Sequence, residues 1–431
     1  MTIYSASVSS LISGLLLIVS TNSNAYVNQV SNAPISTDRL VEFYETTVVA
    51  DDIWNNLTNS FVDQYEAGRY AQAAVAAHTA YNLAENTWGP EDINTADSML
   101  KLGIINETLG DLEQAKEYML GSLVILETQL DPNHEDVAVV LTNLANVHFE
   151  EKQVEKAELF HKRALEIRKK KFGDNHPTVA QSVYNLAVLY DELAEYDNAE
   201  RLYIEALSIW NYAFGTDHPY IANALNNLAN VYMLTGNLTK AIELHEDSLA
   251  ARRAIYGNHH PEVARSLINL GSVYIKTQSY ENAKPMYQEA ITLAENLFGQ
   301  EHPQVAMLLY SLANIYHIQG RIEATPQIQK DDIKINEGSD VIGNLMTVAN
   351  TGVVSVTAKN NAKAFYKKAV PLYERALSIL DNSMGSNHPA VSAMLNELVI
   401  LYRSIGKENK AEQMLARLSE YNHSPSDIHA Q

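Results

Sequence analysis

The 431-residue chain contains no cysteine and few basic residues. The absence of cysteine excludes a disulfide framework and a lipid anchor attached through cysteine, although stacked helices can build a core in an oxidising compartment without such links. Only 31 Lys and Arg stand against 52 Asp and Glu, so the formal net charge is −21. Because phosphate binding needs a basic surface, this charge argues against a nucleic-acid ligand. It indicates a solvated acidic surface, with attraction of a basic partner as the alternative.

The chain also lacks a recognisable catalytic arrangement. No Ser-His-Asp set, carboxylate pair, glycine-rich phosphate loop or HExxH motif stands out beyond chance. We therefore expect no enzymatic activity, no cofactor and no bound metal.

What the sequence does contain is a repeated His-Pro dipeptide or a remnant of it. The histidines follow one another at a constant interval of 42 residues, at His134, His176, His218, His260 and His302. A constant period of this length is typical of a repeat array. It favours one long solenoid over the three separate domains that the chain length alone would suggest.

Each unit of the repeat contains two helical patterns separated by a turn. Between the histidines at 218 and 260, apolar residues follow helical spacing over 221–232 and again over 242–250. The proline after the histidine suits the first turn of a helix, and Gly257 suits a left-handed helix end. The sequence therefore predicts two helices per unit.

Aligned on the histidine, the units share a leucine ten residues on, a small residue eleven on, an aromatic residue fourteen on and an alanine twenty-three on. The leucines are Leu144, Leu186, Leu228, Leu270 and Leu312, and the alanines are Ala157, Ala199, Ala241 and Ala283. These columns resemble the tetratricopeptide repeat, and the phrases NLANVY, AERLYIEALSI and FGTDHP are similar to the 42-residue kinesin-light-chain type.

The resemblance covers roughly residues 51 to 421. It implies an all-α, right-handed α-solenoid of about eight helix-turn-helix repeats, whose first helices line a concave groove. It does not imply a motor subunit, because residues 26–50 show no heptad pattern and the repeat type serves unrelated roles.

The N-terminal 25 residues differ in kind from the repeats. The apolar run at 11–19 is too short to span a bilayer comfortably, and small residues precede Tyr26, so we expect a signal peptide cleaved after Ala25 and a periplasmic or secreted protein. Because no Lys or Arg precedes the apolar run, an uncleaved membrane anchor is the alternative. Residues 26–50 are expected to form a linker and a helix that caps the array, and residues 422–431 a disordered tail.

The array is interrupted once. His302 and His388 lie 86 residues apart, which is 44 more than one period. We therefore predict repeats over 51–320 and 365–421 with an insert at 321–364. Its polar residues and the β-branched run at 353–357 favour a loop with a β-hairpin, and a decayed repeat is the alternative.

The repeated histidines do not predict a metal or acid–base site. Residues at one phase of a solenoid lie along a ridge and cannot converge on one ion, so we interpret them as turn residues before a helix. Three other histidines replace Tyr or Phe at packing columns and are expected to be partly buried: His148, His161 and His245.

Asparagine recurs nine residues after four of the histidines, and in three units it occurs three residues further along the same helical face. Asn is a mediocre helix former, so helix propensity does not explain its recurrence. On the face that the resemblance places in the groove, an amide can donate to and accept from the main chain of an extended peptide. Alternatively, these side chains bond neighbouring helices or descend from a duplicated ancestor. With the aromatic and Arg side chains of the same face, the predicted groove residues are Asn143, Asn146, Tyr184, Asn185, Asn226, Asn227, Asn230, Arg265, Asn269, Tyr310 and Asn314.

The function expected from the sequence is that of an exported, non-enzymatic scaffold that binds a protein or peptide in its groove. It would contact no nucleic acid, and no membrane once the signal peptide is removed. The alternatives are a regulatory sensor that responds to a ligand and, if the N-terminus stays uncleaved, a membrane-anchored assembly factor. An enzyme that uses the insert is disfavoured because the insert has neither His nor Cys.

Overall fold

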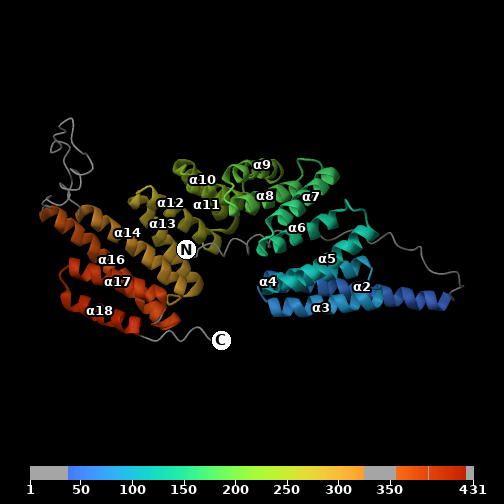
Figure 1. The fold of residues 1–431 in the computed structure, drawn as a ribbon, viewed down its shortest axis with the longest axis horizontal. Coiled ribbons are helices and arrows are strands. Elements are labelled where there is room, and N and C mark those ends of the chain that lie inside the picture. The colour runs from blue at the N-terminus through green and yellow to red at the C-terminus, as the bar shows by residue number, and fades with distance from the viewer. Residues whose placement is uncertain (1–36, 325–355, 387, 424–431) are drawn as a thin grey trace. The chain divides into compact units, whose positions relative to one another are not determined.

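The computed structural model describes residues 37–324, 356–386 and 388–423. Within these ranges every regular element is an α-helix (Figure 1). The predicted signal peptide, the first part of the predicted linker and the centre of the predicted insert lie outside the described residues. The prediction of an all-α repeat fold is confirmed.

The sixteen described helices pair in chain order into eight helical hairpins, the number that the sequence predicted, and they fall into two compact units. Unit 1 contains α2 (Thr37–Glu66), α3 (Tyr70–Thr87), α4 (Ile93–Leu109), α5 (Leu112–Gln129), α6 (Glu135–Glu150), α7 (Val154–Phe172), α8 (Pro177–Glu192) and α9 (Tyr196–Phe214). Unit 2 contains α10 (Pro219–Thr235), α11 (Leu238–Tyr256), α12 (Pro261–Lys276), α13 (Tyr280–Phe298), α14 (Pro303–Ala324), α16 (Val356–Met384), α17 (Pro389–Ser404) and α18 (Glu408–His423). Within each unit, the second helix of one hairpin packs on the first helix of the next, as in an α-solenoid.

The repeated histidine starts the first helix of its hairpin. Its Nδ1 accepts a hydrogen bond from the backbone N–H two residues on, which satisfies one of the donors that a helix start leaves open. This cap occurs at His134, His176, His218, His260, His302 and His388. The interpretation of these histidines as turn residues before a helix is therefore confirmed.

Small residues let the two helices of a hairpin approach closely. The alanine column is fully buried at Ala157, Ala199, Ala241 and Ala283. Gly271 of α12 lies against the ring of Tyr287 in α13, where a Cβ on the glycine would come within 2.8 Å of Tyr287 Cε2. The columns recognised in the sequence are therefore packing positions. His148, His161 and His245 are buried as well, as their place in these columns predicted.

Four predicted boundaries were wrong because helices continue past them. α2 runs without a break from Thr37 to Glu66, so the described residues 37–50 belong to the first helix of the first hairpin and do not form a separate capping helix. α14 extends to Ala324, and α16 begins at Val356, which places the last two residues of the predicted β-branched run in a helix. α18 reaches His423, two residues into the predicted tail.

Packing between α14 and α16 explains the longer helices. Ala362 and Tyr366 of α16 are buried, and the Tyr366 ring lies directly on Gly320 of α14. Apolar contacts with a neighbouring helix stabilise helical turns that local helix propensity alone would not stabilise. The remaining residues of the predicted hairpin, at 325–355, lie outside the described part of the chain.

Candidate functional site

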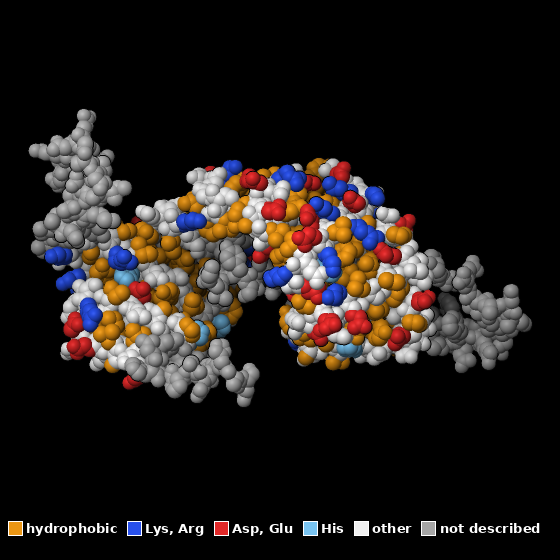
Figure 2. Space-filling view, viewed as in Figure 1, with side chains coloured by type: hydrophobic (Ala, Val, Ile, Leu, Met, Phe, Trp, Pro, Cys, Tyr) orange, Lys and Arg blue, Asp and Glu red, His pale blue; other side chains and the backbone are white. Residues whose placement is uncertain are grey.

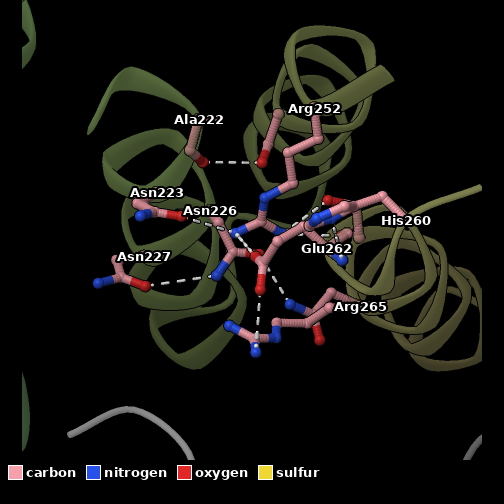
Figure 3. Close-up of polar contacts among 11 residues, drawn as sticks. Ala222, Asn223, Asn226, Asn227, Arg252, His260, Glu262 and Arg265 are labelled. Carbon is pink, nitrogen blue, oxygen red and sulfur yellow. Dashed lines mark hydrogen bonds and ion pairs between the residues drawn. The ribbon is translucent and has the colours of Figure 1, made fainter. Parts of the chain in front are cut away.

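Polar side chains of unit 2 form two hydrogen-bonded groups where α10, α11 and α12 meet (Figure 3). Asn269 of α12 donates from Nδ2 to Oδ1 of Asn226 in α10, at 2.7 Å, and Asn226 donates from its own Nδ2 to Oδ1 of Asn227, at 3.3 Å. Asn226 is buried, whereas Asn227 and Asn269 are half-buried. The amide network therefore joins two successive hairpins and reaches the surface at both ends.

Arg252 of α11 is the centre of the second group. Its side chain is only 2% exposed. The guanidinium donates to Ser266 Oγ at 2.8 Å and to Asn223 Oδ1 at 3.0 Å, and it lies 3.2 Å from the Glu262 carboxylate. These contacts compensate for removing the charge from water and fix the second helix of one hairpin against the first helix of the next.

Glu262 also holds Arg265, the most exposed cation of this network. Arg265 Nη2 lies 3.0 Å from Glu262 Oε1, three residues back on α12, and the Arg265 side chain is 42% exposed. One carboxylate is thus shared between a buried and a half-exposed guanidinium (Figure 3). Two cations beside one anion leave a local excess of positive charge on a chain whose net charge is strongly negative.

In unit 1, two members of the asparagine column are buried and bonded within their own helices. Asn143 donates from Nδ2 to the Val139 carbonyl at 2.9 Å, and Asn185 accepts from Gln181 Nε2 at 3.0 Å. Their exposed fractions are 6% and 5%. Tyr184 is also buried, because its ring packs on Tyr203 and Trp210. These side chains support the wall of the first helices and present little surface to a ligand.

The asparagines three residues further along behave differently. Asn146 of α6 and Asn230 of α10 are half-buried and make no side-chain hydrogen bond with any other residue that the structure describes. We call these two residues the open asparagines. Each amide keeps its donors and acceptor for solvent or a ligand.

The third asparagine of that position, Asn314 of α14, has a partner. Its Oδ1 accepts a hydrogen bond from the Tyr373 hydroxyl of α16, and the Tyr310 ring lies edge-on to Tyr373, with centroids 5.5 Å apart. Burial raises the pKa of the Tyr373 phenol, so it stays protonated and can donate. Asn314 and Tyr310 therefore belong to a contact between α14 and α16.

Sequence reasoning missed the buried arginines. Arg168 of α7 occupies the same column as Arg252 and donates to Ser182 Oγ of the next hairpin. Burial lowers the pKa of Arg168 to about 10. Trp210 fills the same column in the hairpin between them and donates its indole N–H to the Pro177 carbonyl. The signal in the sequence was an arginine at a position where another unit has tryptophan.

A second contact between hairpins also escaped the sequence analysis. His317 Nδ1 of α14 lies 2.9 Å from Glu397 Oε2 of α17, and Glu397 stands where other units carry the column asparagine. The hydrogen bond with His317 holds the pKa of Glu397 below its usual range. No motif marked this pair, because its partners lie 80 residues apart.

The described side chains therefore offer amide donors and acceptors and one half-exposed guanidinium. Over the described ranges, no group of three or more His, Cys, Asp or Glu residues is placed to hold a metal ion. None of the described helices has the length and apolar character needed to cross a membrane. The chemistry available is that of hydrogen bonding to a polar ligand.

Comparison with known proteins identifies the repeat type. The sequence model described as tetratricopeptide repeat matches residues 109–170, 136–211, 179–234, 220–293, 263–324 and 361–421. No curated protein matches the chain.

Several solved structures are similar to the chain. They include BtubC (BKLC) from P. vanneervenii, with 20% identity and a TM-score of 0.46 over 56% of this chain and 92% of that one. The nearly identical repeats of a putative kinesin light chain from Podosopora anserina have 19% identity and a TM-score of 0.42, over 57% of this chain and 96% of that one. A signal transduction ATPase with a tetratricopeptide repeat sensor from Pyrococcus horikoshii has 15% identity and a TM-score of 0.57, over 87% of this chain and 48% of that one. At these identities the likeness shows the fold alone.

Proposed function

Since the chain belongs to the tetratricopeptide repeat family, we propose that it is a protein-interaction scaffold whose first helices bind an extended segment of a partner protein. The observation that carries the proposal is the pair of open asparagines. Asn146 and Asn230 occupy the same place in two different hairpins, and neither has a side-chain partner among the described residues. A half-buried amide without a protein partner is suited to a ligand that supplies N–H and C=O groups, as a peptide main chain does.

In unit 2, three more side chains extend the surface around Asn230. Asn227 and Asn269 are half-buried ends of the amide network, and Arg265 is half exposed on the neighbouring turn of α12. The bound segment would place main-chain amides on the asparagines and an acidic or polar group near Arg265. Each net hydrogen bond would contribute about 0.5–1.5 kcal/mol.

The buried members of the predicted groove have a supporting role in this proposal. Asn143, Asn185, Asn226 and Tyr184 are each less than a tenth exposed. They would hold neighbouring turns and hairpins in place so that the open asparagines point to the ligand without further ordering. Such preorganisation lowers the entropic cost of binding.

Because the described side chains offer binding groups and no catalytic set, we propose a non-enzymatic role. We also propose that the protein is exported after cleavage at Ala25. N-terminal sequencing of the protein purified from its native source tests this directly. A mature chain that starts at Tyr26 is expected, and a chain that retains residues 1–25 would overturn export by cleavage and favour the membrane-anchored assembly factor.

Cross-linking followed by affinity purification tests the binding proposal. Partners captured by the wild type are compared with those captured by a double variant, Asn146→Ala with Asn230→Ala. The matched control is Asn198→Ala, since Asn198 is an exposed asparagine on the second helix α9 and bonds only to Glu195.

We expect the double variant to lose at least one partner that the control retains, while both keep the helical circular dichroism of the wild type. Equal recovery of every partner by all three proteins would overturn the proposal that the first helices bind the partner.

A further inference from the structure

The second helix of the interrupted repeat extends beyond the pattern of the others. The repeat period places its start at Tyr366, in register with Tyr280 of α13, yet α16 begins ten residues earlier at Val356. α16 has 29 residues, whereas α7, α9, α11 and α13 have 19 each. The added turns form a surface that the second helices α7, α9, α11 and α13 do not have.

This surface is basic. Lys359, Lys363 and Lys367 follow one another at intervals of four residues and are all exposed, so they form a row along one side of α16. No Asp or Glu occurs in α16 before Glu374. In Figure 2, Lys and Arg side chains lie at the left edge of the view, where Figure 1 shows α16. We call these three residues the lysine row.

The lysine row reverses the charge found in the other hairpins. The position of Lys367 is acidic in most of them, at Glu113, Glu155, Asp197 and Glu281. There it falls in the first turn of the helix, where a negative charge interacts favourably with the helix dipole. Because α16 starts earlier, Lys367 lies in the interior of the helix, and this dipole preference no longer acts on it.

Neither helix stability nor ion pairing accounts for the row. Like charges four residues apart repel one another on a helix, so the spacing of the lysines opposes helix formation. Across the described ranges, none of the three has a carboxylate within 4.0 Å. In a chain with a net charge of −21, three cations on one face thus have no carboxylate partner among the described residues.

Two other lysines of unit 2 lie over aromatic rings. Lys368 of α16 and Lys284 of α13 both lie within 6.0 Å of the Tyr316 and Phe365 ring centroids. These rings provide an apolar contact area beside Lys284 and Lys368, which is a combination common at protein interfaces.

We propose that the lysine row of α16 is a second binding surface, separate from the first-helix surface, and that it binds an acidic segment of a partner protein. Charge complementarity selects this occupant, because three ammonium groups along one helix face match carboxylates spaced along a peptide. The acidic remainder of the chain repels such a segment elsewhere and so directs it to this helix.

Fluorescence anisotropy with the full-length protein and a fluorescein-labelled deca-glutamate peptide tests this inference. The variant replaces the row by Lys359→Gln, Lys363→Gln and Lys367→Gln, which keeps good helix formers and removes only charge. The matched control carries Lys152→Gln, Lys156→Gln and Lys407→Gln, three exposed lysines outside α16, and so has the same net charge.

We expect the triple variant to bind the peptide about tenfold more weakly than the wild type, and the control to bind as the wild type does. A single Lys363→Gln change should give a smaller loss in the same direction. The proposal is overturned if the control loses as much affinity as the variant, or if the wild type does not bind deca-glutamate.

Vesicles of phosphatidylserine and phosphatidylcholine and an oligo-dT strand are measured in parallel. If either binds through the lysine row and the peptide does not, the acidic protein segment is the wrong occupant.

Discussion

Asn269 of α12 donates a hydrogen bond to Asn226 of α10 at 2.7 Å, across the boundary between two successive hairpins. The two residues belong to neighbouring positions of the repeat, one period and one residue apart. Part of the repeated asparagine pattern therefore fastens hairpins to one another, which was one of the two readings that the sequence left open. The open asparagines, Asn146 and Asn230, have no such bond to any described residue and remain the candidates for ligand binding.

The bond between these two amides should have a measurable effect on stability. Asn269→Ala leaves the buried Asn226 oxygen without its donor, and we expect a loss of about 1–2 kcal/mol in the free energy of unfolding. Asn230→Ala serves as the control, because its side chain makes no hydrogen bond with a described residue, and it should change stability by less than about 0.5 kcal/mol. Urea denaturation followed by circular dichroism measures both. Equal losses would show that the bond does not stabilise this boundary.

Two adjacent arginines should differ strongly in their contributions. Arg252→Ala removes a buried guanidinium and leaves Ser266, Asn223 and Glu262 without its hydrogen bonds and charge, so we expect destabilisation by about 3 kcal/mol. Arg253→Ala breaks a half-exposed ion pair with Glu289, at 2.7 Å, and should cost at most about 1 kcal/mol.

Thermal unfolding of the two arginine variants, with amide hydrogen exchange over α10, α11 and α12, separates these outcomes. Faster exchange should be confined to these helices in the Arg252 variant. If Arg253→Ala destabilises as much as Arg252→Ala, the buried network is not what joins the hairpins.

Stability should decrease as the pH falls below about 6.5. Burial, aided by the charges of Arg168 and Arg252, lowers the pKa of His161 to about 3 and of His245 to about 4. Since the unfolded chain binds these protons near pH 6.5, the stability that neutral histidines provide is complete above that pH. It is lost as the pH falls toward the folded pKa values, by about 1–2 kcal/mol per histidine at pH 5.

A tyrosine in place of one buried histidine should reduce this pH dependence. The same column carries Tyr203 and Tyr287 in neighbouring hairpins, so the fold has room for the ring at His245. We expect His245→Tyr to flatten the melting temperature between pH 7 and 5, whereas His259→Tyr, at an exposed position, should follow the wild type. Parallel curves for all three proteins would contradict the prediction.

The close approach of α14 and α16 should not tolerate a methyl group at Gly320. A Cβ there would lie 2.3 Å from Tyr366 Cε1 and 2.6 Å from Cδ1, on a buried ring. We expect Gly320→Ala to destabilise this hairpin by about 1–3 kcal/mol, despite the better helix propensity of alanine.

Gly121→Ala is the control for Gly320→Ala. Its Cβ would meet only the terminal methyl of Met99, which can move, so its net cost should be small. Thermal melts decide between the two, and equal stability of both variants would show that Tyr366 can shift.

The amino-acid sequence by itself determined the repeat, its period and the two helices of each unit. These features are local: a histidine that caps a helix, a proline in its first turn, and small or aromatic residues at helical spacing act within one hairpin or between neighbours, and each recurs in most of the units. Because the units repeat, even weak signals could be interpreted, such as the histidines that occupy an aromatic column and are therefore buried.

Only the tertiary structure decided which polar residues support the fold and which remain open. Asn143 and Asn146 lie three residues apart on one helix, yet one is buried and bonded and the other is not. The extension of α16 likewise depends on the contact of Tyr366 with Gly320, 46 residues away. Burial and partner choice depend on the neighbouring hairpin, and no pattern within a single helix encodes how closely that neighbour approaches.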